Sequence, residues 1–235
     1  LGFDPETVTE EPYSVYWNWE SGFERDQIRE AEQIRDHNFR AMYGAWDFLK
    51  NRSPQKDRYR KAELYWAAYI TGKRESRRLM GDYVLTQEDL TRHRLHADGC
   101  VTTTWFLDLH FPHPENSRHF PGEEFRAMAL DDPNVKALRT NAPNALVQIK
   151  PYPIPFRCFY SRNVDNLFMA GRNISVTHVA LASPRVMNTT AQMGTVVGRA
   201  ASLCIEIDCS PRELYAWHWK RLHALLSEPG EQVAL

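Results

Sequence analysis

The residues best suited to bind a charged ligand form the run KRESRR, from Lys73 to Arg78. Planar guanidinium groups clamp carboxylates, phosphates or sugar hydroxyls when a fold holds them in a cleft. The run lies between two stretches with strand character, Leu64–Ile70 and Leu79–Leu85, although the first also fits a short helix. A surface turn with solvated charges is the alternative. The pattern alone leaves both interpretations open.

A second candidate site is the turn at Gly171. Leu167–Ala170 is a short apolar run typical of a buried parallel strand, and the glycine after it permits a sharp turn or a close ligand approach. A loop ending at Pro184 then leads into a helix predicted over Val186–Cys204. Its first N–H groups favour electron-rich atoms, and cofactors bind at this edge of open α/β sheets. A strand–loop–helix unit without a ligand fits equally well.

The predicted helix 186–204 is rich in small residues, including Gly194 and Gly198. Glycine costs about 1 kcal/mol relative to alanine inside a helix. We therefore expect the face that carries both glycines to pack closely against a neighbouring element.

The stretch Asp165–Cys204 resembles the carboxy-terminal flavin segment of the FAD-dependent oxidoreductase family, which has the glutathione-reductase-type dinucleotide fold. That family shows N-L-hydrophobic-hydrophobic-A-G-R, then I-S-x-T-H, then S-x-R-V-M and a helix rich in alanine and glycine. The matching residues here are Asn166, Leu167, Ala170, Gly171, Arg172, Ile174, Ser175, Thr177, His178, Ser183, Arg185, Val186 and Met187. A second block, Gly72–Thr86, is similar to the family's G-K-R-E-S-R-R-hydrophobic-x-G-D-Y segment. The likeness extends more loosely from about Tyr16 to the end of the chain.

The resemblance implies an α/β fold, of which this chain would form an α+β fragment. Residues 1–155 would form a substrate-binding mixed β-sheet with helices, including a long helix over 25–51. Residues 156–235 would supply the last strand and helix of an FAD-binding Rossmann-like domain. The family's G-x-G-x-x-G turn does not occur in this sequence, so we expect a carboxy-terminal part of a longer flavoprotein. FAD would then bind to the full-length parent, with the amino-terminal half as partner, and would not be retained by this chain alone.

The resemblance also implies roles for individual residues. The expected cofactor-binding residues are Ala170, Gly171, Arg172, Ser175, Arg185, Val186 and Met187. Backbone N–H groups of the last two would stabilise negative charge on the reduced flavin. Arg74 and Arg77 would face the substrate, with Glu75 as the ion-pair partner that orients them. The expected catalytic residues are His178, Arg77 and His110, and a purely structural loop histidine is the alternative for His178.

Charge and composition exclude several classes of partner. With 235 residues, 43% of them hydrophobic, the chain can form a substantial core, and its net charge of −1 favours neither nucleic acid nor an anionic membrane. No apolar run approaches the ~20 residues of a membrane helix. We expect a small-molecule substrate, and a homo-oligomer is compatible with the sequence. The first residue, Leu1, suggests a processed product or an expressed fragment.

Histidines and cysteines raise metal and disulfide hypotheses that the spacing does not favour. The pairs His93/His96 and His110/His113 lack the i,i+4 spacing that puts two imidazoles on one helix face, so no metal site is predicted. The four cysteines show no C-x-x-C spacing, and we expect buried free thiols.

Start signals predict several elements that would position these sites. Capping-box spacing marks a helix after Ser21 and Glu24, a short turn after Thr86, and a last helix after Ser210. Val101–Leu109 is β-branched and aromatic, which predicts a strand ending beside His110.

Two other functions remain open on the sequence. The 7 Trp and 10 Tyr would suit sugar stacking in a non-redox carbohydrate-binding or polysaccharide-degrading module, and some relatives of the resembled family are labelled polysaccharide lyases. Burial of Trp17, Trp46 and Trp66 would favour a core role for the aromatic residues instead. A scaffolding or dimer-contact role is the third possibility.

Overall fold

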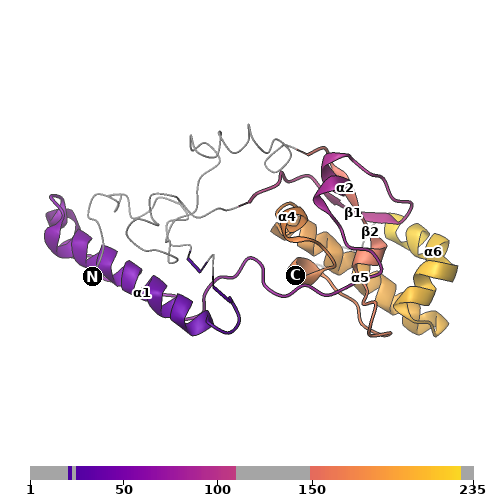
Figure 1. Ribbon diagram of the computed structural model, residues 1–235, viewed down its shortest axis with the longest axis horizontal. Helices are drawn as coiled ribbons and strands as arrows, with labels where there is room; N and C mark the ends of the chain where they lie inside the picture. The colour runs from indigo at the N-terminus through magenta and orange to yellow at the C-terminus, as the bar shows by residue number, and fades with distance from the viewer. Residues whose placement is uncertain (1–20, 23–24, 110–148, 229–235) are drawn as a thin grey trace. The chain divides into compact units, whose positions relative to one another are not determined.

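The computed structural model describes residues 21–22, 25–109 and 149–228. The chain divides into two compact units (Figure 1). One comprises Leu1–Lys73 and His110–Lys136, and the other comprises Arg74–Leu109 and Ala137–Leu235. The described residues of the two candidate sites from Arg74 to Met187 belong to the second unit, whereas Lys73 belongs to the first.

The first unit is built on α1 (Ala31–Asp47), which continues as a π-helix over Phe48–Arg52 and is followed by a 3-10 helix over Lys56–Tyr59. Buried side chains recur at helical spacing along one face, at Ile34, Ala41, Ala45 and Leu49. The helix predicted over 25–51 is thus confirmed in its central part.

The predicted start of this helix is wrong. The helix begins at Ala31 with no side-chain cap, and the Ser21 hydroxyl donates to Asn38 Oδ1 at 2.7 Å instead. Asp26 closes a turn ahead of the helix by accepting hydrogen bonds from the N–H groups of Ile28 and Arg29. Capping competes with other local bonds of the same side chain, and here the tertiary bond of Ser21 prevails.

The strand predicted at Leu64–Ile70 is also wrong, because this stretch forms neither strand nor helix. Tyr65 and Trp66 are 99% and 74% exposed, so the burial of Trp66 that would favour a core role is not observed. Trp46 is half-buried, and Trp17 lies outside the described residues. An apolar composition favours a strand only where a neighbouring strand completes its hydrogen bonds.

The second unit is a mixed α/β arrangement. Its sheet pairs β1 (Gly99–Thr103) with β2 (Tyr152–Pro155) in antiparallel register, Val101 opposite Ile154. Its helices are α2 (Gln87–Thr91), α4 (His178–Leu181), α5 (Met187–Ile207) and α6 (Pro211–Ser227), with 3-10 helices over Phe156–Cys158 and Gly171–Asn173. Helix α5 contacts both β1 and α6.

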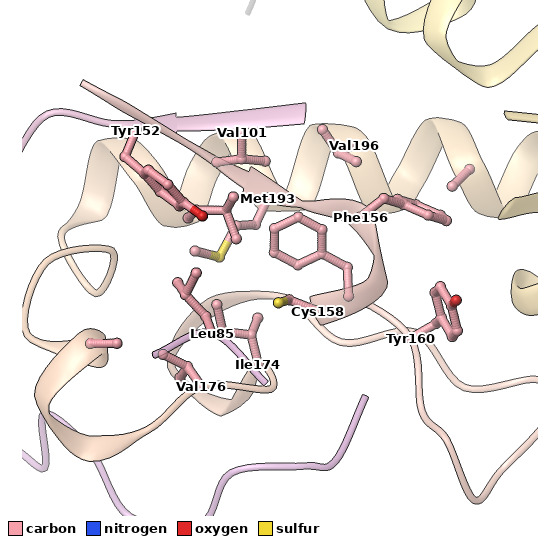
Figure 2. Packing of buried hydrophobic residues seen from close by; sticks show 14 of the residues in the cluster. Leu85, Val101, Tyr152, Phe156, Cys158, Tyr160, Ile174, Val176, Met193 and Val196 are labelled. Atoms are coloured by element: carbon pink, nitrogen blue, oxygen red, sulfur yellow. The ribbon is translucent and has the colours of Figure 1, made fainter. Parts of the chain in front are cut away.

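One core holds the sheet against α5 (Figure 2). The buried side chains of α5, among them Met193 and Val196, pack with Val101, Tyr152 and Phe156. The α5 residues recur at helical spacing, at Met193, Val196, Ala200 and Leu203. Burial of the Met, Val and Leu side chains contributes roughly 1.5–3 kcal/mol each, so this face of α5 helps to stabilise the unit.

Several predicted strands are shorter in the structure. Val101–Leu109 is strand only as far as Thr103, and Leu79–Leu85 contributes only isolated bridges at Gly81 and Leu85. Leu167–Ala170 is not a parallel strand, because its single bridge, Tyr160 to Phe168, is antiparallel. The helix predicted over 186–204 is confirmed, with Val186 as its N-cap.

Two predicted helix starts are confirmed. Thr86 and Asp89 form a complete capping box at α2, and Ser210 and Glu213 form another at α6, with Pro211 in the first turn. Among the described helices, none is long and apolar enough to cross a membrane.

The expected close packing around the glycines of α5 is not observed. A Cβ atom added at Gly194 or Gly198 would meet no atom within 4 Å, and both residues are exposed. In the described part of the chain, the glycine face of α5, defined by these two residues, is therefore uncovered.

Candidate functional site

Two segments far apart in the sequence are bonded to each other in the second unit. Residues 74–86 are the arginine segment, and residues 165–187 are the turn segment. Leu79 N–H donates to Asn173 O at 2.9 Å, Leu85 N–H donates to Ser175 O at 3.0 Å, and Thr177 N–H donates back to Leu85 O at 2.9 Å. The two sequence motifs thus form one structural site.

Glu75 connects the two segments through its side chain. One carboxylate oxygen lies 2.6 Å from Nδ1 of His178, the first residue of α4, and the other accepts a hydrogen bond from Arg78 Nη1 at 2.9 Å. The Glu75 side chain is 19% exposed, whereas that of His178 is 61% exposed. The carboxylate therefore holds an imidazole that is largely exposed.

A second ion pair lies on the same site. Arg185 Nη2 donates to the Asp108 backbone oxygen at 2.6 Å and lies 3.6 Å from Asp108 Oδ2. Burial, and then the positive charge of Arg185, lower the pKa of Arg74 to about 10, while Asp108 and Glu75 act in the opposite direction. Arg74 therefore remains a cation at neutral pH. We call these residues the charged cluster: Arg74, Glu75, Arg78, Asp108, His178 and Arg185.

The Gly171 turn lies against α5. Gly171 has φ +85°, a conformation that favours glycine, and a Cβ atom added there would meet no atom of the described residues within 4 Å. Its N–H donates to the sulfur of Met193 at 3.3 Å, which fixes the turn on α5. At the start of α5, no side chain caps the helix, and Met187 is 88% exposed. The N–H groups of this first helical turn are thus available for an electron-rich ligand.

Comparison with models of protein families shows which family the chain belongs to. A family model described as FAD dependent oxidoreductase matches residues 3–226. The chain belongs to the FAD dependent oxidoreductase family. The family match confirms the resemblance seen in the sequence. It also supports the prediction of a flavin-dependent oxidoreductase. Searches among curated proteins and among solved structures found no match.

In this member of the FAD dependent oxidoreductase family, a buried hydroxyl positions the loop before α5. Ser183 Oγ donates to Trp105 O at 2.7 Å and lies 3.0 Å from Thr103 Oγ1, and Ser183 is fully buried. These bonds hold the loop on β1 two residues before Arg185. The sequence interpretation missed this role because the spacing of Thr103 and Ser183 gives no sign of their contact.

The structure corrects the predicted arginine pair. Glu75 pairs with Arg78, three residues on, and with His178, whereas Arg77 is exposed and is not paired with Glu75. The role of Glu75 as an ion-pair partner is thus right, but one of its predicted partners is wrong. The side chain that reaches the Glu75 carboxylate is that of Arg78, at 2.9 Å.

The remaining predicted residues lie in different surroundings. Ala170 and Arg172 flank the Gly171 turn, with Arg172 exposed. Ser175 is fully buried, and its backbone bonds to Cys158 and Leu85 on either side, so its side chain faces no open surface. His110 lies outside the described residues.

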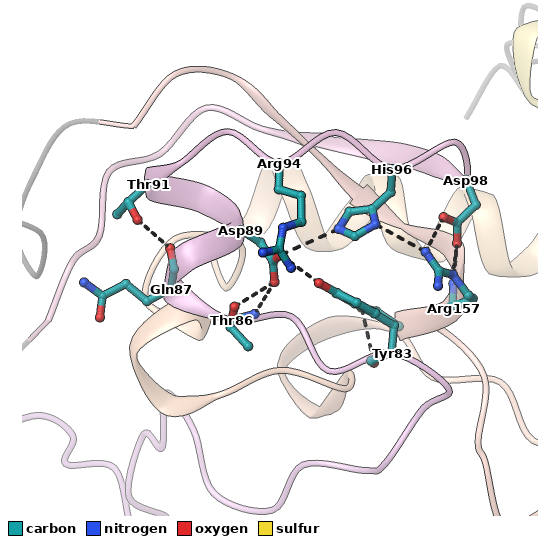
Figure 3. Close-up of polar contacts among 10 residues, drawn as sticks. Tyr83, Thr86, Gln87, Asp89, Thr91, Arg94, His96, Asp98 and Arg157 are labelled. Carbon is teal, nitrogen blue, oxygen red and sulfur yellow. Dashed lines mark hydrogen bonds and ion pairs between the residues drawn. The ribbon is translucent and has the colours of Figure 1, made fainter.

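His96, one of the histidines considered for a metal site, has polar partners of another kind. Figure 3 shows His96 between Asp89 and Arg157, at 3.7 Å from Asp89 Oδ1 and 3.3 Å from Arg157 Nη2. Arg157 in turn pairs with Asp98 at 2.9 Å. Within residues 21–22, 25–109 and 149–228, no group of three or more His, Cys, Asp or Glu side chains is arranged to hold a metal ion. His96 is part of a buried polar network.

Proposed function

We propose that this chain forms the substrate side, and the carboxy-terminal cofactor side, of an oxidoreductase that acts on a small molecule with FAD. The observation that carries the proposal is the backbone pairing of the arginine segment with the turn segment. This pairing joins Glu75 to His178 at 2.6 Å, beside the Gly171 turn and the start of α5.

The residues near Gly171 fit a flavin cofactor in chemistry. A glycine with open space at its missing Cβ allows a close approach to the backbone, and uncapped helical N–H groups suit the electron-rich edge of a flavin. The residues that would hold the cofactor are Ala170, Gly171, Arg172, Arg185, Val186 and Met187. When bound, FAD supplies the acceptor or donor for two-electron chemistry.

The charged cluster would bind and orient the substrate. Arg74 offers a guanidinium group to a carboxylate or to sugar hydroxyls. The Glu75 carboxylate holds a proton on Nδ1 of His178, which leaves Nε2 to accept a proton from a substrate hydroxyl. A small polar substrate, including a carbohydrate derivative, fits these groups.

We also infer that the nucleotide half of FAD is held by an amino-terminal part of the protein that packs on the glycine face of α5. Two helical glycines are unfavourable by about 1 kcal/mol each unless a close contact uses them. The exposure of Gly194 and Gly198 supports a partner that approaches the helix backbone.

The first test is an absorption spectrum of the complete gene product, purified without added cofactor, beside that of this chain alone. We expect flavin bands in the complete product and none in the isolated chain. A colourless complete product that also fails to bind added FAD would overturn the proposal.

A second test addresses the substrate side. In a flavin-containing product, His178→Asn is expected to slow flavin reduction by substrate about a hundredfold while the flavin stays bound. His223→Asn, on the exposed surface of α6, is the matched control. Equal reduction rates in both variants would remove His178 from the mechanism.

A non-redox carbohydrate-binding role is the second candidate, and one observation favours it. Tyr65 and Trp66 are 99% and 74% exposed in the first unit, as stacking platforms for sugars require. Affinity electrophoresis against soluble polysaccharides tests this role. Retardation that Trp66→Ala abolishes, in a protein without flavin, would favour it over the redox function.

A further inference from the structure

Two cysteine side chains meet at the carboxy-terminal end of α5. The helix ends at Ile207, Asp208 adopts a left-handed conformation with φ 51°, and Cys209 N–H donates to Cys204 O at 3.0 Å. This is the hydrogen bond of a Schellman cap, which brings these two side chains together. Their sulfur atoms lie 4.0 Å apart.

The pair differs from the other two thiols. All four cysteines are free, but Cys100 donates to Ile154 O at 3.7 Å and Cys158 donates to Tyr83 O at 3.5 Å. Among these four thiols, only those of Cys209 and Cys204 form a hydrogen bond with another sulfur, with Cys209 as the donor. Cys204 is buried, whereas Cys209 is half-buried and so is the thiol that a dissolved reagent reaches first.

We propose that Cys204 and Cys209 form an oxidation site that converts reversibly to a disulfide in the presence of hydrogen peroxide. The Cys209 sulfur attacks the peroxide, so that an S–O bond forms, the O–O bond breaks and water leaves. The Cys204 sulfur then attacks the Cys209 sulfur, the S–S bond forms, the S–O bond breaks and a second water leaves. One peroxide is reduced, the two thiols are oxidised, and both thiol protons leave in the water.

The order of these steps follows from the surroundings. Burial raises the pKa of Cys204 to about 12, so this residue remains a thiol at neutral pH and is the slower nucleophile. Cys204 therefore suits the second step, where an adjacent sulfenic acid makes the attack intramolecular. The product would link the last turn of α5 to the residue before Ser210, the N-cap of α6.

Peptide mapping of the reduced, folded chain tests the site directly. Both cysteines lie in one tryptic peptide, Ala200–Arg212, whereas Cys100 and Cys158 lie in others. After treatment with stoichiometric hydrogen peroxide and then an alkylating reagent, we expect this peptide to be unalkylated and lighter by two hydrogens than its reduced form. Reduction with dithiothreitol should make both cysteines available for alkylation again. Cys209→Ser is expected to leave Cys204 alkylated, and Cys100→Ser, the matched control, to leave the disulfide unchanged.

The outcomes separate a redox pair from a packing contact. A peptide that stays doubly alkylated while Cys100 or Cys158 is oxidised would show that the two sulfurs only fill the helix cap, and would overturn the proposal. Irreversible oxidation of Cys209 without a disulfide would overturn it as well. The wild-type result stands even if a variant fails to fold.

Discussion

Nδ1 of His178 lies 2.6 Å from the Glu75 carboxylate, although the two residues belong to segments far apart in the sequence. A carboxylate only accepts hydrogen bonds, so it selects the protonated Nδ1 atom of the imidazole. Nε2 of the neutral ring is then unprotonated. This contact orients the exposed His178 ring on the half-buried Glu75 carboxylate.

The first prediction concerns this tautomer. Long-range proton–nitrogen NMR spectra, recorded where the imidazole ring is neutral, should show His178 protonated at Nδ1. Glu75→Gln should weaken that preference, because an amide offers a donor as well as an acceptor at the same position. Glu88→Gln, on an exposed side chain of α2, should leave the His178 signals in place. A wild-type ring protonated at Nε2 would contradict the assignment.

The second prediction uses the glycine face of α5. Gly194→Ala should raise the free energy of unfolding of the isolated chain by about 1 kcal/mol, because the added methyl group meets nothing and alanine favours the helix. In the complete gene product, the same change should lower FAD occupancy, because the inferred partner would need this space. Denaturant unfolding of the isolated chain and the flavin-to-protein absorbance ratio of the complete product measure the two effects. Higher stability with unchanged occupancy would refute the inferred contact.

The third prediction concerns Gly81, which bridges to Ser161. A Cβ atom at Gly81 would lie 2.5 Å from Arg157 O and 3.1 Å from Tyr160 O, and backbone atoms cannot move aside easily. Gly81→Ala should therefore lower the free energy of unfolding by about 2 kcal/mol. Gly72→Ala, where the added atom meets nothing within 4 Å, is the control and should change little in the same denaturant titration.

The fourth prediction concerns acid stability through Asp89. Burial alone would raise the pKa of this carboxyl, but hydrogen bonds from Tyr83 at 2.7 Å and from Thr86 at 2.8 Å outweigh it and hold the pKa below its usual 3.8. A carboxyl group whose pKa is lowered by folding stabilises the fold at pH values above its ordinary pKa. This contribution is lost as the pH falls below that pKa. Unfolding free energy should therefore drop below about pH 4.

Asp89→Asn tests this assignment. The amide presents a donor toward groups that are themselves donors, so the variant should be less stable at neutral pH by about 1–3 kcal/mol. It should also lose part of its acid dependence, because the titrating group is gone. Glu88→Gln is the matched control, since its carboxylate forms only an exposed ion pair with Arg92. An acid profile equal to that of the wild type would exclude Asp89 as a contributor.

Local signals in the sequence were sufficient for some elements. The capping boxes at Thr86 and Ser210, the helix after Val186 and the turn at Gly171 depend on residues close together in the chain, so their patterns could be read directly. The expected strands at Leu64–Ile70 and Leu167–Ala170 failed, because a strand requires a partner that local composition does not specify.

By itself, then, the sequence determined the family of this protein, the residues of its two motifs and the local starts of its helices. Only the tertiary structure decided that the two motifs are bonded to each other, that Glu75 pairs with Arg78 and His178, and that Cys204 meets Cys209. The first group depends on residue type and short-range backbone geometry. The second depends on which distant backbone and side-chain groups complete each other's hydrogen bonds, and burial selects those pairs only once the whole unit has folded.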